Sequence, residues 1–247
     1  MRRLSRWACL ALALAGLHAV PAWALTEQQL RAAIADDDLP DDALFKPWPG
    51  VPDRTLVAWS DYRSMTTDQV DGGATPTGPD VPDVVDITVL VVQTSTGHVL
   101  QRYHEDKAFD SLAVQFDRIE LDTADYALAP GRRAFGVRVR GRHMGCGAED
   151  TATLRLLEPD GASLRNVLVL QTEAHVANCD CGSSRDVTRT LAIAQSATQG
   201  HADLVVHERR DETPDGSIDP RHCHPKARRA ERTLTLHFDG MRYPAID

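Results

Sequence analysis

The sequence predicts an all-β protein, built mainly as an antiparallel sandwich or a partly open barrel, with a short helix at its N-terminus. From residue 84 onward, short runs rich in β-branched and aromatic residues alternate with turn-forming residues, and no useful run of helical period interrupts them. Several of these runs alternate apolar and polar residues, as antiparallel strands with one buried face do. The chain has 247 residues, of which 42% are hydrophobic, so it can bury a sizeable core as one domain.

Residues 1–24 are expected to be a secretory signal peptide that is removed and takes no part in the fold. Three arginines precede an apolar run over residues 7–20, and Ala22-Trp23-Ala24 matches the small-residue cleavage motif. The run is shorter than the ~20 apolar residues of a membrane-spanning helix. We therefore expect cleavage after Ala24, a periplasmic or secreted bacterial protein, and no transmembrane segment in the mature chain.

The mature chain is strongly acidic. The signal peptide holds three of the 27 basic residues and none of the 36 acidic residues, which leaves 24 basic residues against 36 acidic ones and a formal charge of −12. This sign argues against nucleic acid and anionic membranes as partners, because both attract basic surfaces. The expected partner is an unidentified protein or small molecule.

The mature N-terminus, residues 25–65, is expected to hold one helix followed by an irregular segment. Thr26 is placed as the helix N-cap, with Gln29 at the capping-box position. The acidic residues 36–38 should end the helix, because negative charge is unfavourable at a helix C-terminus.

The chain is then expected to stay largely irregular up to residue 83. A proline-rich and acidic stretch covers residues 40–52, with Trp48 as its apolar anchor, and a short strand is expected over 56–59. Residues 66–83 are rich in glycine and proline, which predicts a loop or linker. The β-rich domain follows over residues 84–247.

The β-rich domain is expected to consist of consecutive strands. The first three are centred on residues 85–91, 99–103 and 114–119. After the turn at residues 129–131, six more strands are expected, centred on residues 134–142, 151–157, 164–172, 187–194, 202–208 and 232–238. If these six strands form an up-and-down meander, their first, third and fifth connections share one end of the sheet.

Those three connections carry the four cysteines of the mature chain, Cys146, Cys179, Cys181 and Cys223. In an exported protein such cysteines are usually oxidised, which predicts two disulfides. A bond between Cys179 and Cys181 closes too small a ring for relaxed geometry. The remaining pairings join one of these two residues to Cys146 and the other to Cys223.

A metal site is the alternative for the same end of the sheet. His143 precedes Cys146, and His222 and His224 flank Cys223. Thiolates and imidazoles together suit zinc or copper(I), so no cofactor is expected other than such an ion. Against this, the C-x-C spacing of Cys179 and Cys181 is not the C-x-x-C spacing of common zinc sites.

Two further patterns are candidate sites. Residues 211–222 partly match a calcium-binding loop at Asp211, Asp215 and Asp219, but the closing glutamate and the flanking helices are missing. An Asp-Gly pair in a solvated turn is the simpler interpretation.

Arg138, Arg140 and Arg142 alternate along one strand and should share a face. This basic stripe is a candidate for binding an anionic ligand, and the favoured alternative is pairing with acidic residues of the protein itself.

The histidines outside the cysteine segments offer weaker indications. His104 precedes Glu105 and Asp106, and His201 and His207 flank the strand that contains Asp203. Such groups can serve acid–base or ligand chemistry, but histidines at strand ends are expected to be mostly solvated.

The sequence contains no G-x-S-x-G, P-loop, G-x-G-x-x-G or H-E-x-x-H motif, so no reaction is indicated. The leading interpretation is a non-enzymatic, disulfide-stabilised binding or envelope-associated module. A periplasmic metal-binding protein that uses the cysteine–histidine cluster is the first alternative. A hydrolase with an unrecognised site is the second.

Overall fold

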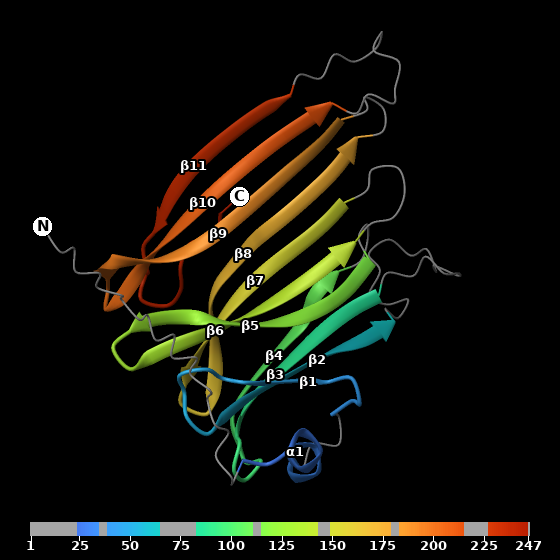
Figure 1. Cartoon of the computed structure of the whole chain (residues 1–247), viewed down its shortest axis with the longest axis vertical. Helices are drawn as coiled ribbons and strands as arrows, with labels where there is room; N and C mark the ends of the chain where they lie inside the picture. Colours follow the sequence, from blue (N-terminus) through green and yellow to red (C-terminus); the bar gives the residue numbers. More distant parts are fainter. Residues whose placement is uncertain are drawn as a thin grey trace, which may run out of the picture.

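The computed structural model describes residues 24–34, 39–64, 83–110, 115–142, 149–178, 183–214 and 227–246. Within these ranges it holds one helix and eleven strands (Figure 1). In chain order the elements are α1 (Glu27–Ala33), β1 (Leu44–Pro47), β2 (Arg54–Ser64), β3 (Asp83–Gln93), β4 (Val99–Asp110), β5 (Gln115–Ala129), β6 (Arg132–Arg142), β7 (Glu149–Asp160), β8 (Ser163–Asn178), β9 (Ser183–Thr198), β10 (His201–Pro214) and β11 (Arg228–Leu236).

One hydrogen-bonded sheet contains all eleven of these strands. Its path runs β1-β2-β3-β4-β8-β7-β6-β5, and β9, β10 and β11 continue in that order from β8. All pairs are antiparallel except that of β4 with β8, a parallel contact at Arg102 and Ser163. The sheet does not close into a barrel. The predicted class, a mainly antiparallel all-β fold with one short helix, is therefore confirmed.

The core consists of three hydrophobic clusters, of which the first and the third lie on opposite faces of β2 and β3. The first lies between β2–β3 and β5–β6, where the Trp48 ring meets the Phe135 ring edge-on at 5.0 Å. The second lies between β6–β8 and β10–β11 and includes Phe238 from the C-terminal segment. The third lies beneath α1. Because β6 contributes to the first two clusters, four consecutive residues, 134–137, are buried.

The N-terminal helix forms where the sequence predicts it. The Thr26 hydroxyl accepts a hydrogen bond from the Gln29 backbone N–H at 3.3 Å, and the Gln29 side chain accepts one from the Thr26 N–H at 2.9 Å. These two bonds complete the predicted capping box. Leu30 and Ile34 then bury the helix against β2 and β3.

The stretch expected to be irregular instead contributes two strands. β1 lies within residues 40–52 and pairs with β2, and β2 is longer than the expected strand over 56–59. Residues 39–64 are therefore part of the same sheet as the β-rich domain. Of the predicted loop or linker over 66–83, all but Asp83 lies outside the described residues.

Strands β6 to β11 form the meander that the sequence predicts, since each strand pairs antiparallel with the next one in the chain. The register aligns five residues across neighbouring strands, in the order Arg142, Asp150, His175, Asp186 and Asp211. Each of them lies near a strand end that borders a cysteine-bearing connection. Those strand ends therefore share one end of the sheet. The four cysteines lie outside the described residues, as do His143, His222 and His224.

The described part of the chain contains no helix with the length and apolar character needed to cross a membrane.

Candidate cation site between β3 and β4

Helix α1 covers only part of one face of β2, β3 and β4, which we call the helix face. Leu90 of β3 packs beneath the helix. Further along the same strand, Thr88 pairs with His104 of β4, and Asp86 pairs with Asp61 of β2. Alternate residues of a strand point to the same face. Along β3 the helix face therefore carries first the apolar side chain of Leu90, then the hydroxyl of Thr88 and then the carboxylate of Asp86.

The pairing of β3 with β4 is interrupted opposite Asp86. The flanking pairs are Ile87 with Glu105 and Val85 with Phe109, so β4 carries extra residues at this point. One of them, Lys107, has a φ of 54°, in the left-handed region that is uncommon for residues other than glycine. Its N–H donates a hydrogen bond of 2.8 Å to Asp86 Oδ1. Asp86, which is only 4% exposed, therefore stabilises this β-bulge.

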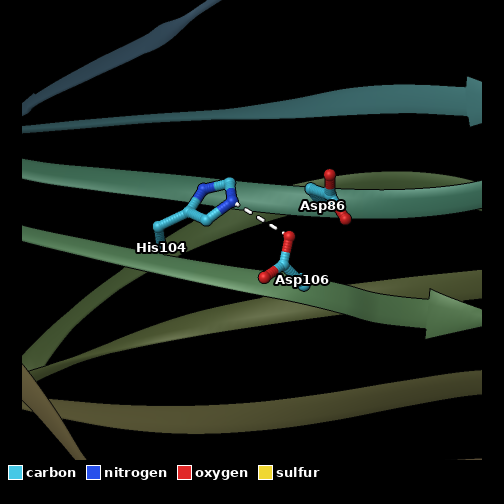
Figure 2. A group of neighbouring side chains, drawn as sticks. All are labelled: Asp86, His104 and Asp106. Atoms are coloured by element: carbon cyan, nitrogen blue, oxygen red, sulfur yellow. Dashed lines mark ion pairs between the residues drawn. The ribbon is translucent and has the colours of Figure 1, made fainter.

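Asp86, His104 and Asp106 converge beside the bulge, as Figure 2 shows. One potential ligand atom from each residue lies within 4.8 Å of those of the other two. The His104 Nε2 atom is 3.4 Å from Asp106 Oδ1. The side chain of His104 is 46% exposed and that of Asp106 is 72% exposed, so the group is open to solvent on one side.

The His104 ring is held by a second contact. Its Nδ1 atom lies 2.9 Å from the hydroxyl of Thr88, which is buried. In the tautomer with hydrogen on Nδ1, the ring donates to Thr88, and the lone pair of Nε2 faces the Asp106 carboxylate. Metal-binding histidines are usually oriented in this way by a hydrogen bond on their other nitrogen.

A hollow of about 340 Å³ adjoins the group and is lined by Trp59, Asp61, Thr88, Arg102 and His104. Asp61 lies directly opposite Asp86 in the neighbouring strand. Like charges in this position destabilise a sheet, and Arg102 offsets part of the negative charge. The helix face thus concentrates carboxylates and one imidazole at its end.

The arrangement has two chemical interpretations. A protonated His104 can form an ion pair with Asp106, but a pair this exposed contributes little to stability. Alternatively, two carboxylates and an imidazole form a ligand set for a divalent transition metal ion, with coordination positions left open to water.

The predicted basic stripe has acidic partners on neighbouring strands. Arg138 Nη2 is 2.8 Å from Asp122, Arg140 Nη1 is 2.8 Å from Glu173, and Arg142 Nε is 3.5 Å from Asp150. Burial alone would raise the pKa of the Asp122 carboxyl, but hydrogen bonds from the Ala124 backbone, Arg138 and Tyr126 lower it overall. These contacts are the intramolecular pairing that was favoured from the sequence.

The calcium-like pattern is only partly described. Asp211 lies in β10, where it contacts Arg209 and Arg229. Asp215 and Asp219 lie outside the described residues.

His201 does not fit the expectation of a solvated histidine at a strand end. It is buried, its Nε2 is 3.1 Å from the fully buried Glu158, and its ring stacks on Phe238 at a centroid distance of 3.9 Å. The expectation failed because the C-terminal segment covers this strand end. His207 is exposed and lies 3.1 Å from the Thr233 hydroxyl.

Sequence reasoning identified His104 and Asp106 but missed Asp86 and Thr88. The available indication was an acidic residue inside the apolar run Val84–Val92. A lone carboxylate in such a run has to find a partner when the strand is buried. The identity of that partner depends on the strand register, which the sequence alone does not provide.

Comparisons with protein-family models, with curated proteins and with solved structures found no match to this chain.

Proposed function

We propose that this chain is an exported, non-enzymatic binding protein whose ligand is a divalent first-row transition metal ion. Asp86, His104 and Asp106 are the proposed ligands. The observation that carries the proposal is the convergence of these three side chains with the His104 ring held by Thr88. The export of the chain rests on its predicted signal peptide.

The donor set favours some ions over others. Ca²⁺ and Mg²⁺ prefer oxygen ligands alone, whereas imidazole suits Zn²⁺, Ni²⁺, Cu²⁺ and related ions. An ion of charge +2 would neutralise Asp86 and Asp106. Because two of the three ligands are solvent-exposed, the ion would exchange with solution, as it does in a protein that binds or carries metal.

We also propose that two disulfides link Cys179 and Cys181 to Cys146 and Cys223. The β6–β11 meander supports this, because the strand ends bordering all three connections share one end of the sheet. The strand pairs that these connections join, β6–β7, β8–β9 and β10–β11, have midpoints two strand spacings apart, about 10 Å. The Cα atoms of a disulfide lie about 4.4–6.8 Å apart, so the connections need to lean together by only a few ångströms.

Metal binding is tested by titrating the metal-free, oxidised chain from residue 25 onward with ZnCl₂ in a calorimeter. We expect saturable binding of one ion, weakened at least tenfold in His104→Gln and Asp86→Asn. His207→Gln is the matched control, because it makes the same change at an exposed histidine of β10, and it should bind as the wild type does. Excess Ca²⁺ should not compete.

Intact mass measured on the same sample tests the disulfides, and we expect the loss of four hydrogens and no free thiol. Zn²⁺ binding that is unchanged in His104→Gln would contradict the β3–β4 site. Four free thiols together with a bound ion would favour the cysteine–histidine cluster instead.

A further inference from the structure

The β-bulge beside the candidate cation site is held from both faces of β4. On the helix face, Asp86 accepts the Lys107 N–H. On the opposite face, Arg155 of β7 makes three contacts with the same bulge. Its Nε lies 2.7 Å from Glu105 Oε2, its Nη2 lies 3.0 Å from Glu105 Oε1, and its Nη2 donates to the Ala108 carbonyl at 2.6 Å.

Arg155 lies where the strands β1–β4 meet the strands β5–β11 of the sheet. β4 pairs with β8 at Arg102 and Ser163 alone, whereas the other neighbouring strands share several consecutive pairs. We call this junction of β4 with β7 and β8 the seam. Side chains supplement its single backbone pairing, since Arg155 binds Glu105, and Asn166 of β8 donates to the Tyr103 hydroxyl at 3.3 Å.

The seam contains buried polar groups, and not all of their atoms have a hydrogen-bond partner among the described residues. The Arg155 side chain is only 7% exposed, and Tyr103 donates to Glu105 at 2.7 Å. Burial, together with the neighbouring Glu105 carboxylate, raises the pKa of Tyr103. Yet Arg155 Nη1 and Asn166 Oδ1 are buried without a hydrogen-bond partner among the described residues. Unpaired buried polar atoms cost free energy, so the closed seam is less stable than its contacts alone would make it.

The candidate cation site can stabilise the closed seam. Asp86 and Asp106 carry like charges at the point where β4 leaves its regular pairing with β3, and their repulsion favours separation of the bulge from β3. An ion bound between them replaces this repulsion with attraction to both. The ion therefore has a higher affinity for the conformation in which residues 106–108 stay against Asp86. In that conformation the Glu105 carboxylate and the Ala108 carbonyl lie where Arg155 can donate hydrogen bonds to them.

From this geometry we infer that cation binding on the helix face is coupled to the closure of the seam on the other face of β4. The inference rests on the proposed function and adds its regulation. The two events share one short segment of β4, residues 104–108, which holds two of the proposed ligands and the groups that bind Arg155. Coupling of this kind is reciprocal: the factor by which seam closure raises the ion affinity equals the factor by which ion binding favours closure, so a variant with a less closed seam binds the ion more weakly.

Glu105→Gln tests the coupling, because it removes the charge that binds Arg155 and leaves the three proposed ligands in place. In calorimetry on the chain from residue 25 onward, we expect Zn²⁺ to bind this variant about five- to tenfold more weakly than the wild type. Arg155→Lys, which keeps the charge but loses the two-point contact, should weaken binding in the same direction. Glu173→Gln is the matched control, because it removes a partly exposed glutamate that pairs with Arg140 away from the seam, and it should bind Zn²⁺ as the wild type does.

Hydrogen exchange gives a second readout that a purely structural role of Glu105 would not change. In the wild type, saturating Zn²⁺ should slow amide exchange in β4 and also in β7 and the first half of β8. In Glu105→Gln the protection should be confined to β3 and β4.

Equal Zn²⁺ affinity in the wild type and Glu105→Gln, with protection confined to β3 and β4 in both, would overturn the coupling and leave the metal site standing. Absence of Zn²⁺ binding in the wild type would overturn the proposed function and the coupling together. Circular dichroism identifies variants that have not folded. If a variant does not fold, the coupling is judged from the wild type alone, by whether Zn²⁺ slows amide exchange in β7 and the first half of β8 as well as in β4.

Discussion

Replacing Glu208 by glutamine is expected to remove much of the acid dependence of this protein's stability. Glu208 is 1% exposed and lies on β10 between Arg189 of β9 and Arg232 of β11, which are its direct partners in the strand register. Its carboxylate is 2.7 Å from Arg189 Nε, 2.7 Å from Arg232 Nε and 2.6 Å from Arg210 Nε. One buried carboxylate therefore ties three strands together.

The pKa of Glu208 indicates how much its carboxylate contributes to the free energy of unfolding. Burial alone would raise this pKa, but hydrogen bonds from Arg232, Arg210 and Arg189 outweigh it and lower the pKa to about 2. Each pH unit between the folded and unfolded pKa values corresponds to about 1.4 kcal/mol, so a fall from 4.5 to about 2 corresponds to about 3 kcal/mol. Solvent and salt reduce this figure, because the side chains of Arg210 and Arg232 are partly exposed.

The direction of the pH dependence of stability follows from the lowered pKa of Glu208 in the folded state. Above the unfolded pKa, near 4.5, the carboxylate is charged in both states and its contribution to stability is fully present. As the pH falls toward about 2, the unfolded state takes up the proton first, and the contribution is lost. Other lowered carboxyl pKa values also affect the wild-type profile, those of Asp53, Glu120, Asp122, Asp203 and Asp239.

The assay is urea unfolding of wild type and Glu208→Gln at pH 7, 4.5, 3 and 2, because the difference between the two proteins isolates Glu208. Because solvent and salt screen the contacts, we expect a difference of no more than about 3 kcal/mol at pH 7, shrinking progressively below pH 4.5. Glu231→Gln, an exposed glutamate on β11 that pairs with Arg229, is the control and should change stability by about 0.5 kcal/mol or less. A difference between wild type and Glu208→Gln that stays constant from pH 7 to pH 2 would refute the reasoning.

Three further predictions concern the site, the core and the helix. Thr88→Val removes the hydroxyl that holds the His104 ring, and calorimetry should show Zn²⁺ affinity reduced about tenfold with the fold preserved in circular dichroism. Phe135→Ala leaves a cavity beside Trp48, and urea unfolding should show a loss of about 3–5 kcal/mol. Thr26→Ala removes the helix N-cap and should cost about 1 kcal/mol by the same measurement, whereas Thr26→Ser should cost much less.

The parts of the fold that depend on local pattern were predictable from the sequence. Alternating residues identified β11, and the capping residues Thr26 and Gln29 located the start of α1. The order of β6 to β11 followed from proximity in the chain, because consecutive strands usually pair when their connections are short. That order also predicted that the strand ends bordering the cysteine-bearing connections share one end of the sheet.

The parts that depend on distant partners were not predictable. β1 ends at Pro47 and was expected to be irregular, but it is an edge strand, where a missing N–H is tolerated. β3 is buried on both faces at Leu90 and Val92, because α1 covers one face there. The burial of Glu158, His201 and Glu208 likewise depends on side chains that lie tens of residues away in the chain.

The candidate cation site shows how such distant pairing turns ordinary residues into a specific arrangement. Asp61, Asp86 and Asp106 lie on three neighbouring strands, and in the sequence no two of them are closer than 20 residues. The register of β2 with β3 and the bulge in β4 bring their carboxylates to the same end of the helix face. A sheet gains nothing from neighbouring like charges, and Asp86 also has to be desolvated. Part of this cost is offset within the chain, by the Lys107 N–H and by the charge of Arg102. A bound cation offsets more of it, which is the physical reason to regard this end of the helix face as a binding site and not only as a hydrophilic edge.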